Sequence, residues 1–237
     1  MEKKLAGVVF AILFAFSFYA QAITFTSDAN IQAGDNWNGV IVHDTPPNHT
    51  TVNMTGGNVG SIDAYNASTI NISGGWISFL SSYDNAMINI SNNANVSLSA
   101  GAGNSSTLNV YGGTIRQLDG SGSSTVNIYE GTIGYIGGGL IADESSIFNL
   151  RGGLYTYISA GSSATINIFG YDLAKTITGG TYGYGQVTGF WQSGSAFTIN
   201  LNYSGAYSAI NLIPEPATLL LFGIGVPIIS GLRRKSS

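Results

Sequence analysis

A short motif that recurs about every 18 residues constrains this chain more than any other feature. The clearest copy, Thr-Val-Asn-Met-Thr-Gly-Gly, begins at Thr51. Further copies of decreasing similarity begin at Thr69, Thr107, Thr125, Met87, Ile147, Thr165 and Thr198. The asparagines at the third position are separated by 18, 18, 20, 18, 22, 18 and 33 residues: Asn53, Asn71, Asn89, Asn109, Asn127, Asn149, Asn167 and Asn200. Spacing this regular is typical of a solenoid, in which each repeat forms one coil.

The apolar positions within each repeat indicate strands. Counted from the first residue of a copy, apolar side chains recur at +1, +3, +8 and +11, as at Val52, Met54, Val59 and Ile62. Alternation at +1 and +3 has the period of a strand with one buried face. The glycine pair that follows allows a corner in which no side chain fits. Each repeat is therefore expected to contain short strands joined by tight corners.

We predict an all-β fold, a parallel β-helix (solenoid) of about seven coils of 18–22 residues that spans 51–213. Proline is absent from the sequence between positions 47 and 214, as expected where each coil donates its amides to the next. Residues 23–50 are expected to form an irregular first coil and N-terminal cap. The extra residues of the two longer coils are expected to bulge at 100–106 and 137–146. An aromatic-rich segment, 189–197, is expected to cover the last open edge.

The N-terminal residues have the pattern of a secretory signal peptide. Two lysines precede the apolar run 5–16, and Ala20 and Ala22 form the small-x-small pattern that signal peptidase requires. We therefore predict a helical signal peptide over 1–22 that signal peptidase removes. The alternative is a membrane anchor, for which the apolar run is short.

The C-terminal residues combine a proline-glutamate-proline motif, an uncharged run and a basic end. The residues are Pro214, Glu215, Pro216, the run 217–232, Arg233, Arg234 and Lys235. The basic cluster is expected to stay on the cytoplasmic side of a membrane that the apolar run enters. Together, residues 214–237 resemble the PEP-CTERM sorting signal of exported proteins from Gram-negative bacteria that make extracellular polysaccharide. The alternative is a plain C-terminal anchor.

The resemblance has consequences for partners and location. It implies that the apolar run is a membrane helix and that an exosortase recognises and removes the tail. The protein would then be exported across the inner membrane, held there transiently, and delivered to the cell surface or the extracellular space.

Charge and cysteine content exclude several classes of protein. The chain has no cysteine and 8% charged residues, which excludes a disulfide scaffold and a thiol enzyme. Residues 23–213 hold three basic and ten acidic side chains, a formal net charge of −7. A surface of this charge does not attract nucleic acid or anionic lipid. We therefore expect no nucleic-acid partner.

Position +4 of the later repeats carries the candidate binding residues. It is occupied by Tyr111, Tyr129, Arg151 and Phe169, which successive coils would align about 4.8 Å apart. Aromatic rings and an arginine in this arrangement can contact sugar rings. The alternative is that the aromatic residues only stabilise the strands. The threonine and asparagine positions are likewise expected to form either structural ladders or a polar face for glycan or ice.

Catalysis is not expected from the charged residues. The three basic side chains of the body, Arg116, Arg151 and Lys175, occupy different repeat positions. Asp63 and Asp119 share position +12 but lie three coils apart, about 14 Å at 4.8 Å per coil. Glycosidases need two carboxylates about 5–9.5 Å apart. The sequence therefore predicts no catalytic residue, no metal site and no cofactor.

Our interpretation is an exported, non-catalytic protein of the bacterial cell surface or extracellular matrix, sorted by an exosortase. We expect it to associate with exopolysaccharide or biofilm. One alternative is a polysaccharide lyase or hydrolase on the same fold. A third is an ice- or mineral-binding solenoid.

Overall fold

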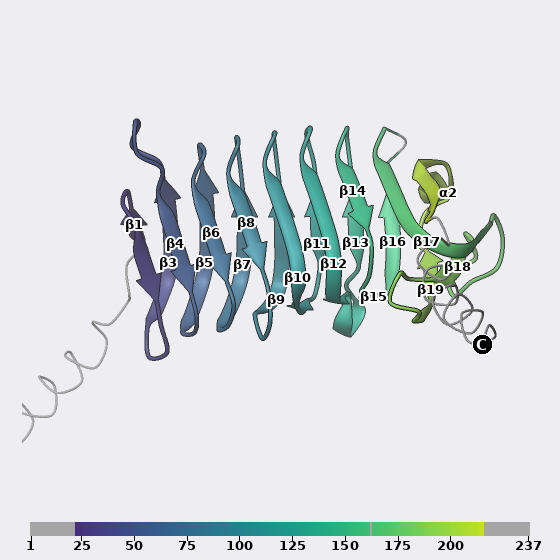
Figure 1. Ribbon diagram of the computed structural model, residues 1–237, viewed down its shortest axis with the longest axis horizontal. Helices are drawn as coiled ribbons and strands as arrows, with labels where there is room; N and C mark the ends of the chain where they lie inside the picture. Colours follow the sequence, from purple (N-terminus) through teal and green to yellow (C-terminus); the bar gives the residue numbers. More distant parts are fainter. Residues whose placement is uncertain (1–21, 162, 216–237) are drawn as a thin grey trace, which may run out of the picture.

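The computed structural model describes residues 22–161 and 163–215, and it confirms an all-β solenoid (Figure 1). The chain winds through about eight coils. Equivalent residues of successive coils are parallel partners, so that Thr51 pairs with Thr69 and Thr69 pairs with Met87. The helices expected near the two chain ends fall on 1–21 and 217–232, outside the described residues. In the part of the chain that is described, no helix is long and apolar enough to cross a membrane.

Two sets of parallel strands run the length of the molecule. The front sheet, which carries the repeated asparagine, consists of β2 (Ala29–Ile31), β4 (Thr51–Met54), β6 (Thr69–Ile72), β8 (Met87–Ile90), β10 (Thr107–Ile115), β12 (Thr125–Ile133), β14 (Ile147–Leu150), β17 (Thr165–Thr176) and β20 (Ile210–Pro214). The rear sheet consists of β1 (Ile23–Phe25), β3 (Asn36–His43), β5 (Asn58–Tyr65), β7 (Trp76–Ser82), β9 (Asn95–Ala102), β11 (Leu118–Gly120), β13 (Leu140–Ala142), β16 (Tyr157–Ala160) and β19 (Ala196–Leu201). A short strand, β15 (Leu154–Tyr155), pairs with the end of β12.

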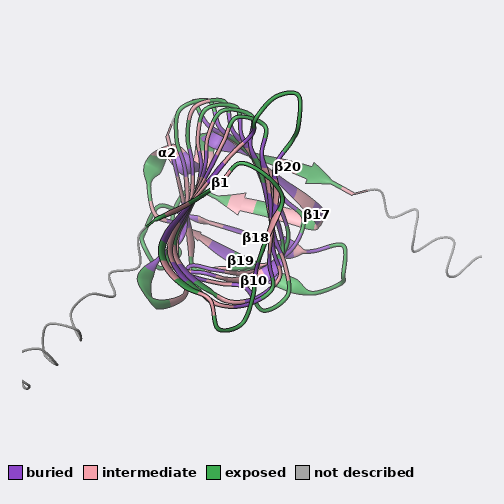
Figure 2. Cartoon of the chain, turned by 90° about the vertical axis from the view of Figure 1, so that its left-hand side faces the viewer, coloured by how far each residue is buried: buried purple, intermediate pink, exposed green. Residues whose placement is uncertain are grey.

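The predicted apolar positions form the core. Val52, Met54, Val59 and Ile62 are fully buried, and so are the residues at +1 and +3 of the following coils through Ile168. In the two longer coils the residues at +11, Leu98 and Ile136, are 37% and 79% exposed, and Ala100 and Leu140 are buried in their place. Viewed along the axis, the inward-facing strand residues fill a narrow interior and the corners are exposed (Figure 2). Stacking thus buries an apolar face that one coil alone leaves open. The described core residues lie between Ile31 and Ile210, so residues 23–215 hold this core complete.

The first coil is regular, which corrects the prediction of an irregular cap over 23–50. Strands β1, β2 and β3 pair in parallel with β3, β4 and β5, respectively. Ile31, Val40 and Val42 are fully buried, and Asn30 pairs with Asn53. This coil lacks the threonine and the glycine pair of the consensus, but it keeps the alternation that buries one face. The solenoid therefore has one more coil than the sequence spacing indicated.

The insertions begin before the predicted bulges at 100–106 and 137–146, and the second one overlaps its predicted range. In the 20-residue coil the register shifts before Ser99, next to the exposed Leu98, and Ala100–Ala102 stays paired on both sides. In the 22-residue coil the additional residues form a 3₁₀ turn at Tyr135–Gly137. Leu140–Ala142 is a regular strand. Both insertions lie before the buried serine that precedes the next repeat, Ser106 in one coil and Ser146 in the other.

The C-terminal end is closed by antiparallel strands. Strand β17 extends past the front sheet and is followed by β18 (Gln186–Phe190) and β19. Strand β18 pairs antiparallel with both β17 and β19. Helix α2 (Ser204–Ala209) then leads into β20. Trp191 is 3% exposed and stacks on Phe197 at a ring-centroid distance of 3.8 Å. The aromatic-rich closing segment is therefore confirmed.

The last repeat predicted from sequence is not a coil of the front sheet. Thr198 and Asn200 lie in β19, where Asn200 pairs with Tyr157 and with Gln186. The position expected for Asn200 is taken by Asn211 in β20, which pairs with Asn167. The long 33-residue interval therefore contains the closing hairpins before the chain returns to the front sheet.

Candidate functional site

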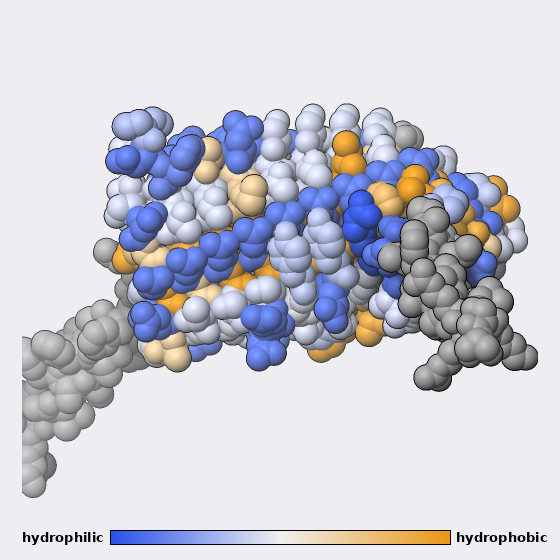
Figure 3. Space-filling model, in the orientation of Figure 1, coloured by the Kyte–Doolittle hydropathy of each residue, from blue (hydrophilic) through white to orange (hydrophobic). Residues whose placement is uncertain are grey.

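The repeated asparagines form a continuous hydrogen-bonded column, the asparagine ladder. Each side-chain Nδ2 donates to the Oδ1 of the preceding coil, at distances of 2.8–3.4 Å. The members are Asn30, Asn53, Asn71, Asn89, Asn109, Asn127, Asn149, Asn167 and Asn211. A hydrophilic band crosses this face of the molecule (Figure 3). Because the amides bond one another, the ladder serves the structure.

The threonine column beside the ladder is interrupted. Met87 and Ile147 occupy two of its positions and are 40% and 39% exposed. A regular array of hydroxyl and methyl groups is therefore broken twice along the face. This arrangement does not favour the ice-binding alternative.

The four predicted binding residues lie on successive coils but form two separate pairs. Tyr111 and Tyr129 stack with ring centroids 4.9 Å apart and an angle of 7° between the ring planes. They are 49% and 42% exposed. The guanidinium of Arg151 lies over the ring of Phe169, 3.7 Å from its centroid. The rings of Tyr111 and Tyr129 thus stack as the sequence predicted, although the register shifts here and the backbone partner of Tyr111 is Glu130.

Stacking along the axis determines which ring faces a ligand can reach. Tyr111 and Tyr129 each cover one face of the other, which leaves the outer faces of the pair. Arg151 leans over Phe169 of the next coil, and among the described residues no ring or cation stacks on the outer face of Tyr129. Tyr129 and Arg151 are therefore neighbours on adjacent coils, and both side chains are partly exposed.

The tyrosine pair borders an open groove with a volume of about 600 Å³. Its lining includes a column of glycines from three coils and polar residues from the closing hairpin. The lining includes Tyr111, Tyr129, Glu130, Gly131, Arg151, Gly152, Gly153, Trp191, Ser193 and Ser195. The groove is therefore formed by the repeats together with the C-terminal closing hairpin, and these two parts lie far apart in the sequence.

The glycine column produces the hollow. Coils approach so closely at Gly152 that an added Cβ would lie 2.1 Å from the carbonyl oxygen of Tyr129. Gly131 has a φ of +119°, a conformation that side-chain-bearing residues rarely adopt. The glycine pair predicted as a corner thus also leaves the space beside the tyrosines empty.

Trp191 is the residue of the groove that the repeat analysis did not identify as part of a site. Its indole Nε1–H donates to the carbonyl oxygen of Gly153 at 3.2 Å, which attaches the closing hairpin to the coil below. The aromatic segment was identified in the sequence, but its contact with position +6 of a repeat 38 residues earlier has no sequence signal.

The groove carries both signs of charge. Glu130 is exposed, whereas Arg151 is 3.4 Å from Glu215, between Nη1 and Oε1. Of the predicted sorting residues, Pro214 pairs with Gly170, and Pro216 and the basic cluster 233–235 lie outside the described residues.

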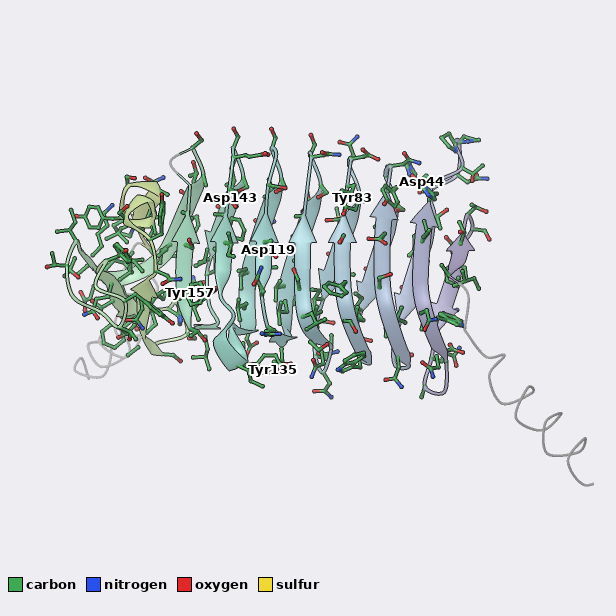
Figure 4. All side chains as sticks on the ribbon, turned by 180° about the vertical axis from the view of Figure 1, so that it is seen from behind. Asp44, Tyr83, Asp119, Tyr135, Asp143 and Tyr157 are labelled. Atoms are coloured by element: carbon green, nitrogen blue, oxygen red, sulfur yellow. The ribbon has the colours of Figure 1, made fainter. Side chains whose placement is uncertain are left out.

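The two carboxylates that share repeat position +12, Asp63 and Asp119, do not form a pair. Asp63 and Asp119 lie in one column with Ser81 and Gly101 between them, which confirms three coil steps. Asp119 accepts hydrogen bonds from Ser99 Oγ at 2.7 Å and Gln117 Nε2 at 2.9 Å. Burial raises the pKa of both carboxyl groups. Hydrogen bonds from Ser99 and Gln117 oppose this shift at Asp119, whereas at Asp63 only a hydrogen bond from Ser81 opposes it. Asp119 lies within a strand, whereas Asp143 lies towards the edge of the solenoid (Figure 4).

A second aromatic stack, which the sequence analysis missed, runs along that edge of the rear sheet. His43 stacks on Tyr65 at 4.8 Å, and Tyr65 stacks on Tyr83 at 5.1 Å. At the adjacent turn, burial opposes ionisation of Asp44, but hydrogen bonds from the Thr50 amide and His49 hold its pKa below the usual value. Within the described ranges, no three His, Cys, Asp or Glu residues are grouped as metal ligands.

Comparison with known proteins concerns the C-terminal end alone. Residues 212–235 match the PEP-CTERM protein-sorting motif. The chain gives no significant match to a curated protein and none to a solved structure. The match overlaps β20, because it begins at Leu212, two residues before the proline-glutamate-proline sequence.

Proposed function

We propose that the solenoid is a non-catalytic, glycan-binding component of the extracellular matrix. The chain carries a PEP-CTERM sorting motif, which marks it as an exported protein that an exosortase sorts to the cell surface or beyond. Residues 1–22 would be removed by signal peptidase. Residues 217–232 would anchor the chain in the membrane until it is processed. The ligand is the exopolysaccharide, or the biofilm built from it.

The observation that carries this proposal is the groove beside Tyr129. Sugars stack their apolar face on an aromatic ring and place their hydroxyl groups against polar side chains. The outer face of Tyr129 supplies the ring, and Arg151 and Glu130 supply a donor group and an acceptor on the same groove. A groove open along the surface also suits a polymer, whose chain continues past the site at both ends.

The separation of the two carboxylates at repeat position +12 favours binding over cleavage. A hydrolase would need two carboxylates about 5–9.5 Å apart, and three coil steps separate Asp63 from Asp119. Among the described residues that line the groove, the single basic side chain, Arg151, is engaged by Glu215 and Phe169. Arginine stays protonated in proteins, so it does not serve as the proton-abstracting base of a lyase.

The test is co-sedimentation of residues 23–215 with exopolysaccharide isolated from the producing organism. In Tyr129→Ala the stacking surface is lost, and retention should fall roughly 5-fold, because one aromatic contact contributes about 1 kcal/mol. Tyr83→Ala is the matched control, since it removes a stacked tyrosine from the opposite edge. Its retention should equal that of the wild type.

The same incubation separates binding from catalysis. New reducing ends or unsaturated products would contradict the non-catalytic role and favour the lyase or hydrolase alternative. Retention without new ends supports a matrix protein. Equal retention by Tyr129→Ala and the wild type would eliminate the groove as the binding site.

A further inference from the structure

The sorting motif begins inside the folded solenoid. Its first residues, 212–214, belong to β20 and pair in parallel with residues 168–170 of β17. Among the strands that the structure describes, β20 pairs with β17 alone, so it is the last strand of the front sheet. The motif therefore overlaps a structural element of the body.

Several contacts hold this last strand in place. Ile210 is 1% exposed, and Asn211 adds the last rung of the asparagine ladder, with its Nδ2 3.1 Å from Oδ1 of Asn167. The ammonium group of Lys175 donates to the carbonyl oxygens of Tyr207 at 3.0 Å and Ile210 at 2.8 Å. The start of β20 is therefore attached by burial, by the ladder and by a charged side chain.

The contacts extend to the glutamate of the motif. The backbone N–H of Glu215 donates to the carbonyl oxygen of Gly170 at 2.8 Å, which continues the strand pairing by one residue. Its carboxylate lies 3.4 Å from Arg151, whose guanidinium is held over Phe169. The peptide bond between Pro214 and Glu215 therefore has its amide nitrogen engaged in strand pairing.

We propose that processing cuts the chain on the C-terminal side of Glu215 and leaves β20 in the mature solenoid. The proposal rests on the exosortase processing assumed in the proposed function. In the cut, a nucleophile of the enzyme forms a bond to the carbonyl carbon of Glu215 or of a later residue as the C–N bond that follows it breaks. The tail leaves as an amine that takes up one proton, and the acyl group passes to water or to an amine acceptor.

The physical reason is the access that the reaction requires. The nucleophile must reach the carbonyl carbon, and the leaving nitrogen must become pyramidal, which breaks a hydrogen bond that its N–H makes in a sheet. A cut at or before the bond between Pro214 and Glu215 would require β20 to separate from β17 first. That separation exposes Ile166 and Ile168, which are fully buried.

The decisive measurement is the intact mass of the processed protein from cells that produce the exosortase. We expect a C-terminal residue at Glu215 or later. A mature chain that ends at Pro214 or earlier would overturn the inference. A chain that keeps its whole tail would also overturn it, whereas glycan retention by 23–215, measured separately, would show whether the groove still binds.

A truncation pair tests the structural basis. The chain 23–215 should unfold at a midpoint about 5–10 °C above that of 23–209, which lacks β20. Hydrogen exchange at the amides of β17 should be faster in the shorter chain, because their neighbouring strand is missing. Equal midpoints and equal exchange would show that β20 is dispensable and would remove the reason for a late cut.

Discussion

The amide side chain is the unit from which the asparagine ladder is built, and its position decides what its loss would cost. An interior asparagine donates to the coil before it and accepts from the coil after it. Asn109 is the most buried of them, at 8% exposure. Asn30, at the first rung, accepts from Asn53 and is exposed, so water can replace its partner.

At this scale we predict that Asn109→Ala is destabilising by about 1–3 kcal/mol, because it leaves Asn89 and Asn127 each with a part-buried, unpaired polar atom. The matched control is Asn30→Ala, for which we expect a loss below about 0.5 kcal/mol. Urea unfolding of residues 23–215 measures both values. Equal effects at the two positions would show that the ladder does not contribute through burial.

Asp119 gives a second prediction, on pH. Burial raises its pKa in the folded state above the ordinary value of 3.8, against the hydrogen bonds from Ser99 and Gln117 and with the nearby Asp143 adding to the shift. The protonated form thus contributes stability that is complete below pH 3.8 and is lost as the pH rises through the higher folded-state pKa.

The test compares the wild type with Asp119→Asn at pH 4 and pH 7. The unfolding free energy of the wild type, minus that of the variant, should be larger at pH 4. Subtraction removes the opposite contribution of Asp44, whose lowered pKa makes the chain less stable in acid. A difference that is independent of pH would contradict the assignment to Asp119.

At the scale of strands and corners, the sequence was informative wherever burial repeats. Apolar residues at +1 and +3 predicted the core because each coil has to bury the same face, and the structure confirms them in every coil through Ile168. Positions +8 and +11 are confirmed in the coils that begin at Thr51, Thr69 and Thr107, whereas the insertions in the two longer coils leave Leu98 and Ile136 exposed. The first coil was expected to be irregular because Val40 and Val42 keep the alternation without the threonine and glycine consensus. The bulges were misplaced because an insertion can enter any corner, and the spacing of asparagines reports only its length.

The corner glycines provide a prediction at this scale. Gly152→Ala places a Cβ 2.1 Å from the carbonyl oxygen of Tyr129, so the two coils have to separate, at a cost of about 1–3 kcal/mol. Gly101 lies in a strand and has nothing within 4 Å of the added Cβ. Gly101→Ala should therefore be neutral or stabilising by up to about 1 kcal/mol.

Thermal unfolding of the two glycine variants gives the measurement. Because Gly152 lines the groove, its variant should also retain less exopolysaccharide at temperatures where it is folded, whereas Gly101→Ala should bind normally. A Gly152→Ala protein as stable as the wild type would mean that the close approach of the coils is not required.

For the whole molecule, the repeat specified the solenoid but not the site on it. Tyr111, Tyr129, Arg151 and Phe169 were identified because they share position +4, which directly follows the four strand positions whose register aligns successive coils. The groove also needs Trp191, which the closing hairpin brings against Gly153. That contact depends on how β18 and β19 fold back over the last coils, and no periodic signal encodes it.

A stack in which each coil contacts its two neighbours should tolerate the loss of one coil. Residues 69–86 form an 18-residue coil between equivalent positions, since Ser68 and Ala86 are both fully buried. Their removal joins Ser68 to Met87 and places Val52 against Ile88 and Asn53 against Asn89, the same pairing that each makes now with a residue of the deleted coil.

We therefore predict that residues 23–215 without 69–86 fold cooperatively, with a midpoint lowered by a few degrees, because nearest-neighbour contacts are fewer by one coil. Exopolysaccharide retention should persist, since every residue that lines the groove lies after the deletion.

The control removes 69–77, half a coil of nine residues. An odd number reverses the faces of the following strand and sets its apolar residues outward, so this variant should not fold. Circular dichroism and thermal scans distinguish the two. If both deletions unfold the chain, its stability is not shared between neighbouring coils, and the solenoid folds as one indivisible unit.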